Sequence, residues 1–248
     1  MTLDLSLIVC TKNSAKSISA CLTSSLPILK AGAELILIDG KSHDNTINLV
    51  LEFLKKYKIS FYKVASQLNS GLYEAFNLAI EITSRQKILF LHSDDVLKSS
   101  EILINDVRNS KSDVIFYGIE IENKTFKRKW HILSLNHINV NSMYLPPHAG
   151  ILVGRGVYSK IGKFRTQYKI AGDFDWMLRL LSSSNISFSF SNEITYIQKS
   201  GGVSNSGLIS EITKFGEDVK VLKSLGFKFP LYKVIRKKIN KVFQLTKI

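Results

Sequence analysis

The first half of the chain alternates between short apolar runs and segments whose apolar residues recur at helical spacing. The apolar runs cover 5–11, 34–40, 60–66 and 87–93, and the helical segments between them cover 14–29, 44–58 and 71–84. This alternation is typical of βαβ units, in which parallel strands form a buried sheet and helices cover both of its faces. The pattern therefore predicts an α/β fold, and ligands in such folds collect at the carboxyl ends of the strands.

The second half is less regular and carries no internal repeat or long linker. The elements expected there are two strands within 113–130 joined by a turn at Asn123 and Lys124, a strand at 150–155, a helix at 171–183 and a half-buried strand at 186–192. We predict one domain over 1–206, followed by a helical, basic tail over 207–248.

Acidic residues follow two of the predicted strands. Asp39 ends the second strand, and the adjacent Asp94 and Asp95 end the fourth. Two neighbouring carboxylates repel by roughly 1–4 kcal/mol, so a cation or a proton is needed to relieve them. Carboxylate oxygens suit Mg²⁺ or Mn²⁺, which usually bridge a diphosphate. The alternatives are a simple turn residue for Asp39 and a helix cap for the Asp94–Asp95 pair.

The net charge is +14, and the basic residues are concentrated at the C-terminus. The stretch 219–248 holds nine Lys or Arg residues and no Asp or Glu. Within it, 231–243 places apolar residues on one helical face and basic residues on the other. Two interpretations stay open: a helix that lies on an anionic membrane, or a helix packed on the domain with a solvated basic face. Nucleic-acid binding is not expected, because no binding motif accompanies the charge.

The cellular setting follows from what the sequence lacks. The two cysteines, Cys10 and Cys21, have no metal-ligand spacing. No apolar run reaches the ~20 residues that span a bilayer, and the N-terminus lacks the basic start of a signal peptide. We therefore expect a reducing, cytoplasmic environment.

The common phosphate-binding motifs are also missing. The first strand is followed neither by G-x-G-x-x-G nor by G-x-x-x-x-G-K-[ST] but by "TKNSAKS", which places Thr11 and Asn13 at the edge of the sheet. This argues against a dinucleotide-binding enzyme and against a P-loop NTPase. A sugar-1-phosphate nucleotidyltransferase is disfavoured too, because its Gly- and Arg-rich loop is not found here.

Seven stretches occur in an order that resembles family 2 glycosyltransferases of the GT-A fold, over roughly residues 3–205. They are "SLIVCTKN", "ELILIDGKSHDNT", "LNSGLYEAFNLAI", "FLHSDDV", "PPHAGILVGRGVYSKIGKF", "KIAGDFDWMLRLL" and "KSGGVSN". The chain most resembles the bacterial enzymes that extend lipid-linked oligosaccharides for O-antigen, capsule or exopolysaccharide. The resemblance implies a three-layer, Rossmann-like sandwich with a mostly parallel mixed sheet.

The resemblance also implies roles for individual residues. The residues expected at the nucleotide sugar are Thr11, Asn13, Asp39, Gly71, Asn77, Ser93, Asp94 and Arg155. The stretch 92–95 stands in the place of a D-x-D motif, so that Asp95 would bind Mg²⁺ or Mn²⁺, with His148 as a further candidate ligand. Asp173 falls where the family has its general base.

Two positions depart from the family pattern. His92 stands where many members have the first Asp of D-x-D, and Gly172 stands where Glu is frequent before the catalytic Asp. These departures keep an alternative open, namely a catalytically inactive sugar-nucleotide-binding or scaffold protein.

The expected chemistry is a single displacement with inversion. Asp173 would take the proton from an acceptor hydroxyl as that hydroxyl attacks the donor sugar. Asp173 and Asp175 point about 200° apart on a helix, so we assign Asp175 to helix capping or to pairing with Arg179. The expected partners are a nucleotide-sugar donor and a polyprenyl-diphosphate-linked saccharide acceptor, and contact with an anionic membrane stays open.

Overall fold

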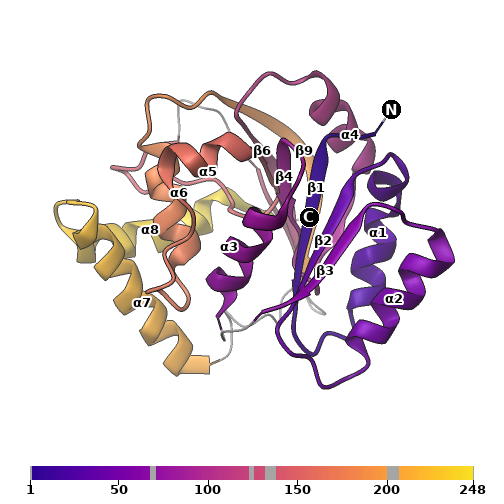
Figure 1. Ribbon diagram of the computed structural model, residues 1–248. Helices are drawn as coiled ribbons and strands as arrows, with labels where there is room; N and C mark the ends of the chain where they lie inside the picture. Colours follow the sequence, from indigo (N-terminus) through magenta and orange to yellow (C-terminus); the bar gives the residue numbers. More distant parts are fainter. Residues whose placement is uncertain (1, 68–70, 123–125, 132–137, 200–206, 248) are drawn as a thin grey trace.

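The computed structural model describes residues 2–67, 71–122, 126–131, 138–199 and 207–247 (Figure 1). The predicted turn at 123–124 and most of the glycine-containing stretch 199–205 lie outside the described residues, as does Asn69 of the family-like stretch that contains Gly71.

Four parallel strands form one half of the central sheet. They are, in spatial order, β3 (Tyr62–Ser66), β2 (Glu34–Asp39), β1 (Leu5–Thr11) and β4 (Lys87–Phe90). The predicted parallel arrangement is confirmed. Strand β4 ends at Phe90, earlier than predicted, because Asp95 N–H closes a turn on the carbonyl of His92. The turn carries the two adjacent acids out of the sheet at its carboxyl edge.

The other half of the sheet mixes both strand directions. β8 (Ile151–Gly154) runs antiparallel between β4 and β6 (Val114–Glu122), and β6 pairs with β7 (Lys127–Trp130) as the predicted two-strand unit. β9 (Phe188–Lys199) runs parallel to β6 and also pairs with the short β5 (Val96–Leu97). Strand β9 is longer than the predicted 186–192 because β6 pairs with it along its full length, across a register shift near Gly118.

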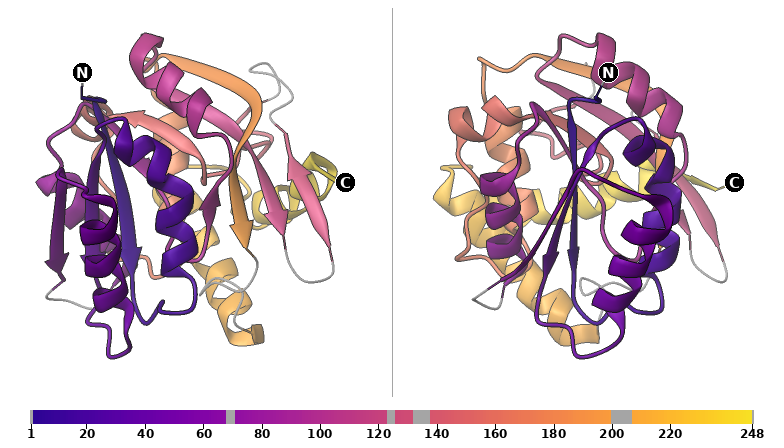
Figure 2. Two further views of the ribbon diagram at one scale, coloured as in Figure 1. Left: turned by 90° about the vertical axis from the view of Figure 1, so that its right-hand side faces the viewer. Right: turned by 45° about the vertical axis from the view of Figure 1, so that its right-hand side comes forward.

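Helices cover both faces of this sheet (Figures 1 and 2). On one face lie α1 (Ile18–Lys30), α2 (Thr46–Tyr57) and α4 (Ser100–Asn109), and on the other lie α3 (Leu72–Ile82), α5 (Arg155–Ile161) and α6 (Gly172–Leu181). Successive strand side chains alternate between the two cores, so Leu7 packs with the first group of helices and Ile8 with the second. The result is the predicted three-layer α/β sandwich.

The C-terminal segment is built into this body. Helices α7 (Gly207–Ser224) and α8 (Pro230–Gln244) pack against α6, and β10 (Leu245–Lys247) pairs antiparallel with β7. Val221, Leu222 and Val234 are fully buried in the cluster that joins these helices to α6. The segment begins where the predicted tail does, but it packs as a part of the domain. Within the described ranges, no helix has both the length and the hydropathy needed to cross a bilayer.

Candidate functional site

The loops that follow β1 and β2 are tied together at the carboxyl edge of the sheet. The Asp39 carboxylate, which is buried, accepts hydrogen bonds from Ser42 N–H (3.0 Å) and Ser42 Oγ–H (2.6 Å). Asn13 N–H donates to Ser42 Oγ (2.9 Å), and Asn13 itself has a φ of 51°, a left-handed conformation that Asn tolerates well. Two of the predicted site residues, Asp39 and Asn13, therefore share one network.

The loop after β4 joins the same edge. Ser14 Oγ and Ser93 Oγ lie 2.8 Å apart, which links the β1 loop to the segment that carries the two acids. The Thr11 hydroxyl is buried, and none of the described residues makes a hydrogen bond to it. Buried hydroxyls usually have a partner, so Thr11 offers an unused polar group beside this edge.

Asp95 and Asp94 occupy different environments. Asp95 is 2% exposed, and its two oxygens accept hydrogen bonds from Tyr196 Oη–H and Lys199 N–H, both at 2.7 Å. Burial raises the pKa of Asp95 to about 6, against the opposing effect of His92 and these hydrogen bonds. Asp94 is half-buried, and within the described part of the chain no group donates a hydrogen bond to it.

Each oxygen of Asp95 accepts one hydrogen bond from the protein, and these bonds hold the β4 loop against β9. A carboxylate oxygen can accept more than one contact, so the metal role of Asp95 stays a prediction. Asp94 is the carboxylate that stays available at the surface.

His92 connects the strand-end acids to the second part of the site. Its backbone N–H donates a hydrogen bond to Tyr196 Oη (3.1 Å), and the centroid of its ring lies 5.9 Å from that of Phe76. A positive charge on His92 lowers the pKa of Asp95 and also that of His148. His92 therefore acts electrostatically on both parts of the site.

Asp173 and His148 form that second part. His148 Nε2 lies 3.3 Å from Asp173 Oδ2, and their side chains are 44% and 29% exposed. Burial tends to raise the pKa of Asp173, but His148, Lys214 and the Phe174 amide outweigh it, so the pKa is lowered. Burial lowers the pKa of His148, with Asp173 opposing the shift. Asp173 is therefore an ionised carboxylate that solvent can reach.

Asp175 is turned away from this position, as predicted. It is fully buried, and it pairs with Arg179 (2.9 Å) and with Arg165 (3.1 Å). The prediction that Asp175 pairs with its i+4 neighbour is confirmed.

The glycine before Asp173 has a steric explanation. A Cβ atom at Gly172 would lie 2.6 Å from Cε2 of Tyr73. Tyr73 Oη donates to the carbonyl of Ile170 (2.6 Å) and lies 3.4 Å from Asp173 Oδ1. The ring of Tyr73 thus fills the space that a side chain at position 172 would need, and its hydroxyl supports the candidate base.

Glu217 of α7 holds the start of α6 and was not found from the sequence. Its carboxylate accepts three backbone N–H hydrogen bonds of 2.8–2.9 Å, from residues 169–171. These bonds fix the backbone of the three residues that lead into α6 and Asp173. No local pattern marks Glu217, because the groups it binds lie 46–48 positions earlier in the chain.

Two predicted nucleotide-sugar residues have other roles. Asn77 uses its amide to bind both the N–H (3.0 Å) and the carbonyl (2.8 Å) of Phe164, whose ring stacks between Tyr73 and Trp176. Arg155 donates to the Thr83 carbonyl (3.2 Å) and follows Gly154, which pairs with Lys87 at the start of β4. That is the opposite edge of the sheet from Asp94. Both side chains bind backbone groups in this structure, and their assignment to the nucleotide sugar stays a prediction.

Gly71 precedes α3 with an extended backbone, and a Cβ there would collide with the carboxylate of Glu74. Its role at the donor stays a prediction.

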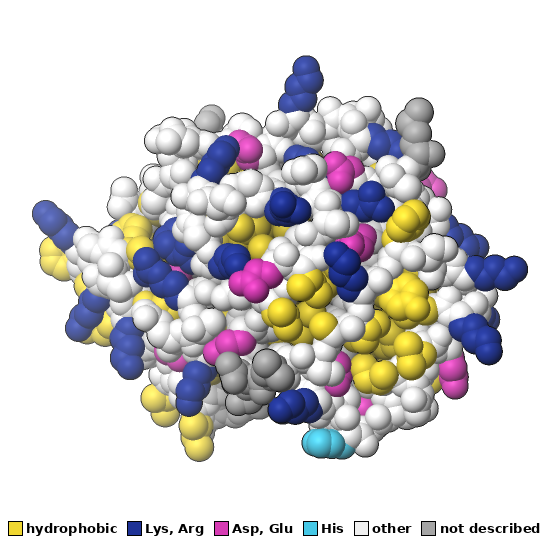
Figure 3. Space-filling model, in the orientation of Figure 1, with side chains coloured by type: hydrophobic (Ala, Val, Ile, Leu, Met, Phe, Trp, Pro, Cys, Tyr) yellow, Lys and Arg dark blue, Asp and Glu magenta, His cyan; other side chains and the backbone are white. Residues whose placement is uncertain are grey.

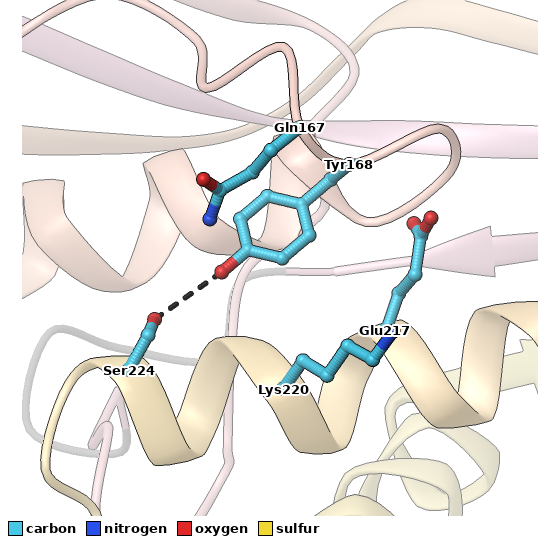
Figure 4. A pocket seen from close by; sticks show the side chains of 5 residues that line it. All are labelled: Gln167, Tyr168, Glu217, Lys220 and Ser224. Carbon is cyan, nitrogen blue, oxygen red and sulfur yellow. Dashed lines mark hydrogen bonds between the residues drawn. The ribbon is translucent and has the colours of Figure 1, made fainter.

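A separate cavity of about 340 Å³ lies between α7 and the loop before α6 (Figure 4). Gln167, Tyr168, Glu217, Lys220 and Ser224 line it, and Tyr168 Oη and Ser224 Oγ lie 3.2 Å apart. None of these side chains comes from the carboxyl edge of the sheet, so the cavity is distinct from the strand-end site. Among the described residues, no group of three or more His, Cys, Asp or Glu side chains is arranged to hold a metal ion.

A family model and a curated relative both show similarity to glycosyltransferases. Residues 6–177 match the family model described as glycosyl transferase family 2. A PGL/p-HBAD biosynthesis glycosyltransferase of Mycobacterium tuberculosis is 26% identical over 216 residues, which is 84% of this chain and 82% of that protein.

Two solved structures share the fold. S. aureus TarS 1–349 in complex with UDP-GlcNAc aligns with a TM-score of 0.69 at 20% identity, over 98% of this chain and 73% of that one. The mannosyltransferase PcManGT from Pyrobaculum calidifontis, in complex with GDP-Man and Mn²⁺, aligns with a TM-score of 0.64 at 13% identity, over 98% and 70%. These likenesses agree with the GT-A architecture expected from the sequence.

Proposed function

Because the chain belongs to glycosyl transferase family 2, we propose that it is an inverting, metal-dependent hexosyltransferase. In this proposal it moves a sugar from a nucleotide-sugar donor to a hydroxyl of a lipid-linked saccharide acceptor, at the cytoplasmic face of the membrane. The product would serve surface polysaccharide biosynthesis. A polyprenyl diphosphate is the acceptor anchor that suits the net charge of +14.

The observation that carries the proposal is the position of Asp173. Its carboxylate is ionised, partly exposed and 3.3 Å from His148 Nε2, at the start of α6. A general base needs an available carboxylate within hydrogen-bond reach of the acceptor hydroxyl. The other first-turn acid of α6, Asp175, is buried in ion pairs. A single available acid at this position favours a one-step displacement with inversion.

The donor would lie along the carboxyl edge of the sheet. Thr11 offers its unused hydroxyl there, and the Asn13–Ser42–Asp39 network gives the β1 and β2 loops a fixed shape. Ser93 ties the β4 loop to the same edge. We expect the nucleoside at the β1 and β2 loops and the diphosphate near Asp94.

We expect a divalent cation to be bound jointly by the protein and by the phosphates of the donor. Mg²⁺ and Mn²⁺ commonly take one or two carboxylates from the protein and complete their coordination with substrate phosphates and water. The carboxylates proposed for this role are Asp95, as the resemblance implies, and the adjacent Asp94, which accepts no hydrogen bond from the described residues; His148, the further candidate ligand, lies next to Asp173. When bound there, the cation would offset the charge that develops on the departing diphosphate. PcManGT is in complex with Mn²⁺, which supports this expectation.

The proposal is tested by thermal shift with nucleoside diphosphates and sugar nucleotides, each with and without Mn²⁺. We expect one nucleotide class to stabilise the protein in a Mn²⁺-dependent way. With donor and an acceptor extract, the protein should release free nucleoside diphosphate, and Asp173→Asn should abolish that release while leaving donor binding intact. Full release by Asp173→Asn would refute the role of the base.

A catalytically inactive sugar-nucleotide-binding protein is the alternative. His92 favours it, because an imidazole replaces a carboxylate where many family members bind metal. Such a protein would bind the donor but release no nucleoside diphosphate with any acceptor extract.

A further inference from the structure

Helix α8 presents its apolar side to solvent and contacts the protein through Val234 and Lys237. The exposed apolar side chains, between 49% and 78% exposed, are Leu231, Tyr232, Ile235, Ile239, Val242 and Phe243. At 100° per residue they fall within one third of the helix circumference. A surface helix of a globular protein normally has the opposite orientation, with its apolar stripe on the core.

The inward side is fixed by contacts that use lysine. Lys237 pairs with the buried Asp218, and its Nζ lies 3.7 Å from the ring centroid of Phe174. Lys241 Nζ lies 5.0 Å from the ring centroid of Trp130, and Val234 is fully buried on this same side. Because these contacts hold the protein-facing side of α8, the helix cannot rotate its apolar side inward without breaking the ion pair between Lys237 and the buried Asp218.

The charges around the apolar stripe define what would cover it. Arg236 and Lys238, both exposed, border the stripe on its two sides. The region 219–248 contains no acidic residue, and the acid next to the stripe is Glu211 of α7, which pairs with Lys238 (3.1 Å). Figure 3 shows dark blue Lys and Arg side chains spread over the end of the molecule where α7 and α8 lie in Figure 1. An apolar stripe bordered by cations matches the acyl chains and anionic headgroups of a bilayer surface.

We propose that the outward face of α8 docks on an anionic lipid bilayer. The six apolar side chains form a stripe about 18 Å long, lying in the plane of the interface. Arg236 and Lys238 then reach the headgroups from either side of the stripe.

This docking sets the distance between membrane and candidate base. Lys237 contacts Phe174, the residue next to Asp173, so α8 lies between the bilayer and the start of α6. A helix with its side chains is about 10–12 Å thick, which brings Asp173 close to the headgroup level. In this respect the inference rests on the proposed function, because an acceptor linked to lipid would present its sugar at that level.

The test is co-sedimentation of the full chain with vesicles, in the absence of donor and acceptor. We expect binding to vesicles that contain phosphatidylglycerol, weaker binding to pure phosphatidylcholine, and partial release by salt. Ile235→Ser/Ile239→Ser should weaken binding about tenfold or more. The matched control is Leu51→Ser/Phe61→Ser, which removes apolar side chains of similar exposure (48% and 45%) and should bind as the unmodified chain does.

A second variant separates a loss of lipid binding from a misfolding of the first variant. Arg236→Glu changes an exposed side chain that forms no ion pair with the described residues, so it should also weaken binding about tenfold, with little change in melting temperature. The inference is overturned if the unmodified chain ignores phosphatidylglycerol vesicles at low salt, or if the control variant loses as much binding. It is also overturned if sedimentation velocity shows a dimer that Ile235→Ser/Ile239→Ser dissociates, because a second copy would then cover the face. Since no substrate is present, a failure of sugar transfer does not affect the result.

Discussion

Replacing Glu217 with alanine tests how the start of α6 is held. The change removes three hydrogen bonds between a carboxylate and the backbone N–H groups of residues 169–171. A hydrogen bond to a charged group contributes about 1.5–3 kcal/mol. Water can reach part of this loop and replace some of the bonds, so we expect a net loss of about 3 kcal/mol rather than the full sum. For a chain of this size that corresponds to a fall in melting temperature of about 6–12 °C.

The matched control is Glu211→Ala on the same helix. Glu211 forms an exposed ion pair with Lys238 (3.1 Å), and such pairs contribute under about 1 kcal/mol. Both variants are measured by thermal unfolding, and turnover is measured at saturating donor. We expect Glu217→Ala to reduce turnover more than donor binding, because the backbone that positions Asp173 is no longer held by hydrogen bonds. Equal melting temperatures for the two variants would show that the three hydrogen bonds do not stabilise the fold as argued.

The remaining predictions concern the two groups of acids. Gly172→Glu should destabilise the protein by about 1–3 kcal/mol through collision with Tyr73, and adding Tyr73→Ala should recover part of the loss in a double-mutant cycle. Because burial raises the pKa of Asp95 to about 6, its contribution to stability is present at low pH and lost as pH rises through 6. Asp95→Asn should therefore gain melting temperature relative to the unmodified chain between pH 5 and 7, and an unchanged difference across that range would contradict the reasoning. Asp94→Ala should remove the Mn²⁺-dependent part of nucleotide stabilisation while leaving melting without Mn²⁺ nearly unchanged; a retained Mn²⁺ effect would exclude Asp94 as the ligand.

Local patterns in the sequence were sufficient for the architecture and for the edge where the site lies. The spacing of apolar residues is set by the geometry of strands and helices, so the four parallel strands and the helices between them could be predicted from neighbouring residues alone. The acids at 39, 94 and 95 were found because the carboxyl ends of parallel strands meet at one edge. Asp173 was found through the resemblance of its stretch to a family motif.

The direction in which each side chain points was decided by partners distant in the sequence. Asp95 is satisfied internally because Tyr196 and Lys199 reach it from β9, and this leaves Asp94 as the available acid. Asn77 and Arg155 bind backbone groups of other elements, and the sequence did not indicate these contacts.

Helix α8 shows the same division between sequence and structure. Its periodicity specifies an apolar face and a basic face, but not which of them meets the protein. Asp218 and the rings of Phe174 and Trp130 attract the lysines inward, and the apolar face is left outward. Those partners come together only in the folded chain, because a helix fixes its own two faces locally while the surface it packs against is assembled from residues far away in the sequence.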